Sequence, residues 1–235
     1  MLLIKRTVAL GVLLSLAATG SFAASAKELS PVPQFHKDVR ALVACLLNSE
    51  RPLIVKYLTE RRGNIGNITN DDCFKNTASG RFGRAGAAVN ADLFTGIAAE
   101  LLLRKLDLDE ADKLMAGAPA IHHYERMTVE KLAPNFQGSR REKEAWVAKV
   151  NHNYDLDSMG DCAVRKAPRL SRNVIFSEYD SPTERDAIAE IMPIISDCAP
   201  QVVSSTDPND FRLFLALNYV RLASLADPSF KAKLL

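Results

Sequence analysis

Apolar residues follow helical spacing along most of this chain. In residues 35–48, Val39, Leu42, Val43 and Leu46 lie three or four positions apart, which places them on one face of a helix. The chain has no run of strict apolar and polar alternation bounded by hairpin turns, which is the pattern of a half-buried strand. We therefore predict an all-α fold. The expected helices cover residues 35–48, 90–106, 108–117, 120–132, 139–151 and 207–226, and further helices begin at Pro52, Pro168 and Pro182.

Several of these helices have clear start signals. Ser181-Pro182-Thr183-Glu184 combines an N-cap serine, a proline at the first helical position and a glutamate at the third. Ser139 and Glu142 have the spacing of a capping box, and Asp207-Pro208 pairs a cap with a proline. Pro193 lies inside the helix that follows Ser181, where we expect it to kink or shorten that helix.

The helices predicted over 90–106 and 207–226 are apolar on more than one face. A helix of this kind is buried, so we expect both to be central. Glu100 is the notable polar residue of the first helix. A carboxylate there could be catalytic, but buried acids are more often satisfied by a partner or lie at the edge of the buried face. Glu100 is therefore our candidate polar site. The alternative is that it has a purely structural role.

One pattern of residues occurs twice. Each copy has a cysteine, a proline, a second cysteine and an apolar helix with a Leu-Phe pair. The earlier copy comprises Cys45, Pro52, Cys73 and Leu93-Phe94, and the later copy comprises Cys162, Pro168, Cys198 and Leu213-Phe214. We interpret this as two related helical modules, residues 27–106 and 154–235, joined by a helical connector, residues 107–153.

The four cysteines are expected to form two disulfides. An even number of cysteines in an exported chain is typical of disulfides, and three pairings are possible. The duplication favours Cys45–Cys73 and Cys162–Cys198, because each module then has its own crosslink. Free or metal-binding thiols are the alternative, but the chain has no Cys-x-x-Cys pair and zinc is disfavoured.

Residues 1–26 have the pattern of a secretory signal peptide. Lys5 and Arg6 supply the charged region, Val8–Ala18 is the apolar region, and small residues allow cleavage after Ala23 or Ala26. An uncleaved anchor is the alternative, but the apolar run is short for a bilayer. We expect a periplasmic or secreted protein with no membrane span after cleavage.

Charge gives no reason to propose nucleic acid as a partner. Without Lys5 and Arg6 the 30 basic residues fall to 28, which equals the 28 acidic residues. Nucleic acids and anionic membranes both require a cationic surface. A protein partner would be another envelope protein or a second copy of this chain.

Motifs for catalysis, metal binding or cofactor binding are missing from the sequence. The histidines His36, His122, His123 and His152 do not form His-Glu-x-x-His, and no Gly-x-Ser-x-Gly occurs. The stretch Gly80–Gly86 is rich in glycine and arginine but lacks the context of a phosphate-binding loop, so we interpret it as a solvated loop. We predict no catalytic residue, no metal and no cofactor.

The later copy resembles a module of small exported proteobacterial proteins that has no assigned activity. The resemblance rests on Cys162-Ala163-Val164-Arg165-Lys166-Ala167-Pro168, on Cys198 with Pro200, and on the leucine-rich helix that follows. It covers 154–222 well and 39–106 less well, because the earlier copy has a shorter span between its cysteines and a loop rich in glycine and asparagine. The resemblance implies an envelope location and a disulfide-stapled helical fold.

These observations favour a non-enzymatic binding or interaction protein of the cell envelope. One alternative is a small hydrolase-type enzyme that uses Glu100 or a histidine in a cleft between the modules. Another is a carrier of an apolar ligand. A carrier should have an apolar cavity of several hundred Å³, an enzyme should have a carboxylate or histidine with a shifted pKa in a pocket, and an interaction module should have an exposed apolar patch.

Overall fold

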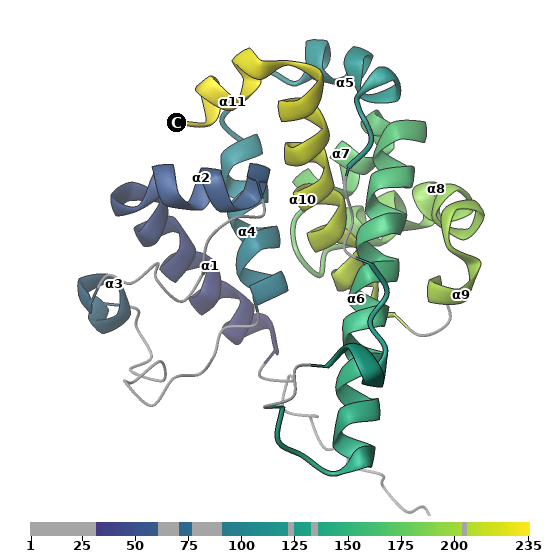
Figure 1. Cartoon of the computed structure of the whole chain (residues 1–235). Helices are drawn as coiled ribbons and strands as arrows, with labels where there is room; N and C mark the ends of the chain where they lie inside the picture. Colours follow the sequence, from purple (N-terminus) through teal and green to yellow (C-terminus); the bar gives the residue numbers. More distant parts are fainter. Residues whose placement is uncertain (1–31, 61–70, 77–90, 122–124, 133–135, 204–205) are drawn as a thin grey trace, which may run out of the picture. The chain divides into compact units, whose positions relative to one another are not determined.

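The computed structural model describes residues 32–60, 71–76, 91–121, 125–132, 136–203 and 206–235. The described residues form helices and no strands (Figure 1), so the predicted all-α class is confirmed. The predicted signal peptide, residues 1–26, and the Gly80–Gly86 stretch lie outside the described residues.

The first part of the fold contains α1 (Val32–Ser49), α2 (Arg51–Glu60), α3 (Asp71–Asn76) and α4 (Ala91–Leu103). A connecting part contains α5 (Asp109–Leu114) and the 3-10 turns η2 (Met115–Gly117) and η3 (Val129–Lys131). The last part contains α6 (Arg140–Lys166), α7 (Pro168–Phe176), α8 (Pro182–Cys198), α9 (Pro200–Val203), α10 (Pro208–Ala226) and α11 (Pro228–Leu234).

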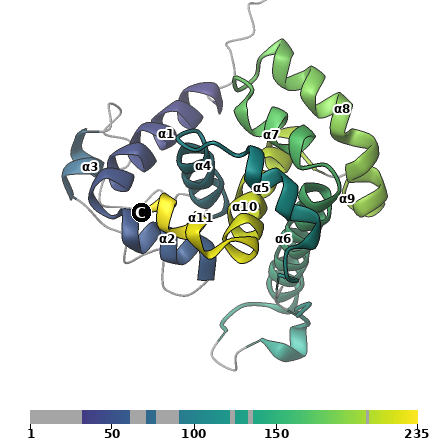
Figure 2. The same cartoon turned by 90° about the horizontal axis from the view of Figure 1, so that it is seen from above.

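Helix α10 is the centre of the fold. It lies between α4 and α6 in both views (Figures 1 and 2), and it also packs against α2, α5, α7 and α11. Every residue from Phe211 to Ala223 is buried, as expected for a helix that is apolar on more than one face.

The described helices share one hydrophobic core. Buried side chains from both predicted modules and from the connector belong to the same cluster, including Leu42, Ile97, Met115, Met159 and Leu215. The two modules therefore do not form separate cores, and side chains from distant parts of the sequence meet in one interior.

Two glycines allow α10 to approach its neighbours closely. A Cβ atom on Gly96 of α4 would lie 2.6 Å from the Cβ atom of Leu213. A Cβ atom on Gly160 of α6 would lie 2.7 Å from the carbonyl oxygen of Phe214. Both distances are far below van der Waals contact, so these helix pairs require glycine.

The predicted disulfides are confirmed. Cys45 of α1 is bonded to Cys73 of α3, and Cys162 of α6 is bonded to Cys198 at the end of α8. Neither disulfide joins the two predicted modules, so each crosslink fixes helices of one module only.

The predicted helix starts agree with the structure. Ser139 and Glu142 form a complete capping box at α6, Ser181 accepts a hydrogen bond from the backbone N–H of Glu184, and α10 begins at Pro208. Pro193 does not shorten α8, which continues to Cys198.

Two predictions about the connector are wrong. The described residues of 120–132 are not an α-helix, and only Val129–Lys131 form a 3-10 turn. The backbone N–H of Met127 donates to Asn151 Oδ1 at 2.8 Å, and Asn151 Nδ2 donates to the Met127 carbonyl at 2.9 Å. These two hydrogen bonds fix the irregular segment around Met127 against α6 and replace helical hydrogen bonds.

The second correction concerns α6, which was predicted to end near Asn151 but continues to Lys166. The predicted boundary between residues 153 and 154 therefore lies inside one helix. Trp146 on its first half is exposed, and its ring contacts Phe136 at a centroid distance of 5.4 Å.

Among the described residues, no helix is both long enough and apolar enough to cross a bilayer.

Candidate functional site

Glu100 lies in the interior, where three arginines surround it. Its Oε1 atom accepts hydrogen bonds from Arg40 Nη1 at 2.7 Å, Arg104 Nε at 2.9 Å and Arg212 Nη2 at 3.0 Å. Arg212 Nε also donates to Glu100 Oε2 at 3.3 Å. The candidate polar residue is therefore satisfied by partners from α1, from α10 and from the turn that follows α4.

Arg212 extends this network to α8. Its Nη1 atom donates to Glu184 Oε1 at 2.6 Å, and its Nη2 atom donates to the carbonyls of Ile175 and Ser177 at 2.9 and 2.8 Å. The side chains of Arg212, Glu100 and Glu184 are each at most 3% exposed. A fully buried guanidinium is thus enclosed by two carboxylates and two carbonyl groups.

The network keeps Glu100 ionised. Burial alone would raise its pKa, but Arg212 and Arg40 outweigh burial and hold the pKa of Glu100 below its usual value. A carboxylate held in this way is a poor proton donor at neutral pH. Glu100 therefore connects α4 to α1 and α10. It is not among the residues that line the cavity of this fold.

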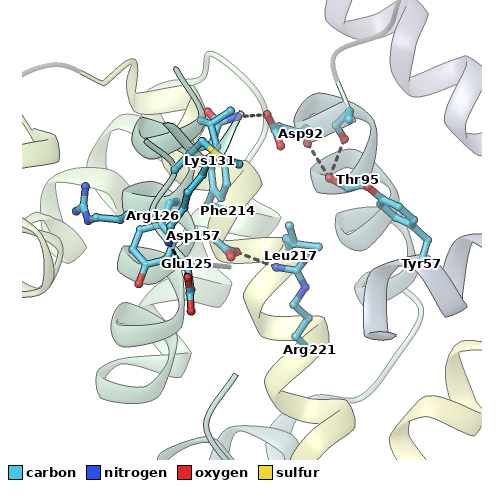
Figure 3. A pocket seen from close by; sticks show the side chains of 15 residues that line it. Tyr57, Asp92, Thr95, Glu125, Arg126, Lys131, Asp157, Phe214, Leu217 and Arg221 are labelled. Atoms are coloured by element: carbon cyan, nitrogen blue, oxygen red, sulfur yellow. Dashed lines mark hydrogen bonds and ion pairs between the residues drawn. The ribbon is translucent and has the colours of Figure 1, made fainter. Parts of the chain in front are cut away.

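A cavity of about 550 Å³ lies where the two predicted modules and the connector meet. Helices α2 and α4 contribute one side, α6 and α10 another, and the segment from Glu125 to Lys131 a third (Figure 3). The described lining residues are Tyr57, Ala91, Asp92, Thr95, Glu125, Arg126, Met127, Lys131, Val150, Asn153, Tyr154, Asp157, Phe214, Leu217 and Arg221.

The cavity has a buried end and an exposed end. Thr95, Phe214 and Leu217 are buried at one end, with exposed fractions of 4%, 5% and 6%. Glu125 and Lys131 are exposed, with side-chain fractions of 87% and 52%. We infer that the mouth of the cavity lies at these two residues.

Most of the charges in the wall are paired with each other. Arg221 Nη1 donates to Asp157 Oδ1 at 2.8 Å, and Asn218 Nδ2 donates to the same oxygen at 3.1 Å. Arg221 Nε donates to the carbonyl of Leu58 at 3.1 Å. This buried pair fixes α10 to α6 and to the end of α2.

The charges near the mouth are also paired. Lys131 Nζ donates to Glu125 Oε2 at 2.7 Å. Arg126 pairs with Asp155, and its guanidinium lies 5.2 Å from the centre of the Tyr154 ring. Together with the bonds between Met127 and Asn151, these contacts hold the segment over the cavity.

Asp92 differs from the other acids of the wall. It lies in the first turn of α4, and its Oδ2 atom accepts a hydrogen bond from the neutral amide of Asn153 at 2.7 Å. Burial raises the pKa of Asp92, while Lys149, Asn153 and Arg221 only partly oppose that effect. The cavity therefore contains one carboxyl group whose charged form is disfavoured by its surroundings.

The cavity has the features of a small-molecule site. The described lining residues include no histidine and no cysteine. No cluster of three or more histidine, cysteine, aspartate or glutamate side chains in the described parts of the chain could hold a metal ion. What remains is a partly apolar cavity with a few fixed polar groups, which is typical of small-molecule sites.

Sequence reasoning missed this site. It selected Glu100, which lies in the ionic network, and the four cysteines, which are in disulfides. A signal for the cavity was present in Arg221, a charged residue within a helix predicted to be buried, because such a residue requires a partner. Nothing in the sequence indicated that Asp92 and Asn153 would meet.

Comparison of the chain with protein-family models, with curated proteins and with solved structures found no match. The resemblance to an exported proteobacterial module therefore stays a prediction, and function is argued from the cavity.

Proposed function

We propose that this chain is an exported, non-enzymatic binding protein that holds a small organic molecule in the cavity between α4, α6 and α10. The observation that carries the proposal is the cavity itself. Its volume of about 550 Å³ lies within the range of about 300–1,000 Å³ that is usual for small-molecule sites. Apolar walls with a few fixed polar groups are also usual there.

A protein partner has less support. The exposed large apolar side chains are distributed over separate elements, and single exposed residues of this kind are normal. They are Phe35 on α1, Leu53 on α2, Leu114 on α5, Trp146 on α6, Leu225 on α10 and Leu235 at the C-terminal end. Binding to another envelope protein or to a second copy therefore ranks below binding of a small molecule.

Export is part of the proposal. Its support is the signal-peptide pattern of residues 1–26 together with the use of all four cysteines in disulfides, which persist in oxidising compartments. The location would be the periplasm or the medium.

We also propose that the chain contains an internal repeat. The helix order α1, α2, α3, α4 corresponds to α6, α7, α8, α10, and each disulfide joins the first and third helices of its set. In this interpretation the last helix of each set, α4 and α10, pack against each other and form two walls of the cavity.

An enzyme is the second candidate, and one observation favours it. The raised pKa of Asp92 in a cavity is a property of general acids and bases. The two candidates differ in what happens to the ligand. A binding protein returns the ligand unchanged, whereas an enzyme converts it on incubation, which mass spectrometry of the recovered molecule would distinguish.

The test is native mass spectrometry of the mature protein purified from its own cell envelope. We expect a bound small molecule as excess mass above a chain that has lost four hydrogens to two disulfides. The variant Val150→Trp places a large ring at the cavity wall and should lose the excess mass. Ala148→Trp, on an exposed part of the same helix, should keep it.

The proposal fails if the wild-type protein carries no excess mass and small molecules do not raise its melting temperature. Retention of the ligand by Val150→Trp would place binding elsewhere and would also contradict it. A clean multiple of the bare mass would instead support self-association.

A further inference from the structure

Four of the charged side chains in the wall of the cavity are paired with each other. Arg221 donates to Asp157 Oδ1 at 2.8 Å and to the carbonyl of Leu58 at 3.1 Å. Lys131 donates to Glu125 Oε2 at 2.7 Å. An ion that entered the cavity and took one of these groups as its partner would have to displace the partner already there.

The other charged residues of the described lining, Arg126 and Asp92, also have partners. Arg126 pairs with Asp155, and Asp92 Oδ2 accepts a hydrogen bond from the amide of Asn153 at 2.7 Å. Acidic and basic side chains are equal in number in the described lining, with Asp92, Glu125 and Asp157 against Arg126, Lys131 and Arg221. The wall therefore has no excess of one sign of charge to attract an ion.

The rest of the contact surface is mainly hydrocarbon. Phe214 and Leu217 of α10 are buried, and Val150 of α6 and Met127 of the covering segment also line the cavity. Figure 3 shows Phe214 and Leu217 on the same helix as Arg221. Apolar surface gains free energy on leaving water for such surroundings, whereas an unpaired ion loses its hydration there and receives no compensation.

The mouth of the cavity offers an ionic group no better position. Glu125 and Lys131 lie there and are paired with each other. A carboxylate on the ligand would have to replace Glu125 beside Lys131, and an ammonium group would have to replace Lys131 beside Glu125. Exchange of one partner for another in an exposed ion pair contributes little to affinity.

We propose that the cavity binds an uncharged molecule with a mainly hydrocarbon surface, which contacts Phe214, Leu217 and Val150. The inference rests on the proposed function, because it names the ligand class of the same cavity. The pairing of the charges in the wall carries it, since an ionic ligand gains a counterion only by displacing one.

The behaviour of Asp92 agrees with this assignment. Burial is the largest effect on its carboxyl group and raises its pKa, although Lys149, Asn153 and Arg221 act in the opposite direction. Asp210 of α10 is a further acidic group that interacts with Asp92. A charge is therefore disfavoured on this side of the cavity even where the protein supplies groups that stabilise it.

The experiment compares decanol with decanoate and decylamine, which have the same hydrocarbon chain and differ at the polar end. Binding to the full mature protein is measured by isothermal titration calorimetry at pH 7, below the aggregation concentration of each probe. We expect decanol to bind at least about tenfold more tightly than either ion, because each ion loses hydration without gaining a free counterion.

Two variants of α10 locate the bound molecule. Leu217→Asn places an amide in the apolar wall and should weaken the binding of decanol at least about tenfold. Leu225→Asn makes the same change at an exposed position of the same helix outside the cavity, and it should change the affinity by less than about twofold. Circular dichroism verifies that both variants are folded, and the comparison of probes on the wild type depends on neither.

The molecule released from the native protein gives a second measurement. We expect the excess mass found by native mass spectrometry to belong to a compound that passes from water at pH 7 into hexane. A compound that stays in the water as an ion would overturn the assignment to an uncharged ligand, while binding of a small molecule would stand.

The remaining outcomes separate the two proposals. If decanoate or decylamine binds as tightly as decanol, or if folded Leu217→Asn keeps the affinity of the wild type, the assignment of an uncharged ligand to this wall is overturned. If no probe binds and the native protein carries no excess mass, both proposals fail.

Discussion

At the scale of single residues, Arg212 is a buried charged side chain whose burial requires several hydrogen-bond partners. Its guanidinium is buried and makes hydrogen bonds to Glu100, Glu184 and the carbonyls of Ile175 and Ser177. Replacing it by methionine would leave two buried carboxylates without their shared cation. We expect Arg212→Met to lower the free energy of unfolding by about 3–5 kcal/mol, measured by urea unfolding with circular dichroism.

An exposed arginine provides the control for this prediction. Arg140 pairs with Glu144 on the first turns of α6, and its side chain is 89% exposed. Arg140→Met should therefore leave the free energy of unfolding nearly unchanged. Equal effects of the two substitutions would show that the buried network is not the source of stability.

His36 makes stability depend on pH. Its ring is buried and stacks on Tyr179 at a centroid distance of 3.9 Å. Burial lowers the pKa of His36 from 6.5 to about 4, against the opposite effect of Glu100. The folded state thus disfavours the charged ring, so the unfolded chain takes up the proton first and stability falls as the pH drops from 6.5 to about 4.

The loss due to His36 should be on the order of 2 kcal/mol over this window. The variant His36→Phe keeps an aromatic ring beside Tyr179 but cannot take up a proton. We expect the difference in unfolding free energy between pH 7 and pH 5 to be larger for the wild type than for the variant. Identical differences in the two proteins would contradict the assignment. The contribution of Glu100 does not interfere, because a carboxyl whose pKa is lowered by folding loses its stabilising effect only below its unfolded pKa of 4.5.

At this scale the sequence identified individual residues but not their partners. Glu100 was recognisable because it interrupts an apolar helix, whereas Arg40 and Arg212 are 60 and 112 positions away. Glu184 was interpreted as part of the start signal of its helix, but its Oε1 atom also accepts a hydrogen bond from Arg212. Local patterns contain no information about such distant pairs.

At the scale of helices, the packing of α10 depends on glycine. A Cβ atom on Gly160 would lie 2.6 Å from Asn218 Nδ2 and 2.7 Å from the Phe214 carbonyl oxygen. Alanine usually stabilises a helix interior relative to glycine by about 0.5–1 kcal/mol. Here we expect Gly160→Ala to destabilise by about 1–3 kcal/mol, because backbone atoms of α6 and α10 would have to separate.

Gly117 is the matched control, because a Cβ atom there would have no neighbour within 4 Å. Gly117→Ala should be neutral or stabilise by up to about 1 kcal/mol through the unfolded state. Urea unfolding of both variants checks the prediction, and a stabilised Gly160→Ala would contradict the close packing of α6 and α10.

The sequence predicted best those helices whose starts are encoded locally. The capping residues Ser139 and Ser181 and the pair Asp207-Pro208 each precede a helix as expected. The helix predicted over 120–132 failed because its backbone is bound by Asn151, a tertiary contact that outweighs helical spacing. The same limit explains why the cavity could not be predicted, since its walls come from five separate segments.

At the scale of the whole molecule, the two disulfides reduce the conformational entropy of the unfolded chain. They close spans of 28 and 36 residues, and the entropic benefit depends only on the logarithm of that span. We expect removal of either pair, by Cys45→Ala with Cys73→Ala or by Cys162→Ala with Cys198→Ala, to cost roughly 3.5–4 kcal/mol in each case. Urea unfolding compares the two double variants.

Alkylation gives an independent check on the disulfides. No cysteine of the exported protein should react with iodoacetamide before reduction, and all four should react after reduction under denaturing conditions. Labelling of any cysteine in the unreduced protein would mean that the crosslinks are incomplete in the cell.

Asp92 connects the stability of the whole molecule to its proposed function. Because the folded state raises the pKa of Asp92, the ionised carboxylate at pH 7 opposes folding, and this cost increases as the pH rises through the raised pKa. Asn in this position can still accept the hydrogen bond from Asn153. We therefore expect Asp92→Asn to raise the free energy of unfolding of the empty protein by about 0.5–1 kcal/mol at pH 7.

Urea unfolding of the wild type and of Asp92→Asn at pH 7 tests this prediction. A variant that is more stable than the wild type would mean that the ionised carboxylate costs folding free energy, as the raised pKa requires. If Asp92→Asn is less stable than the wild type, Asp92 supports the fold.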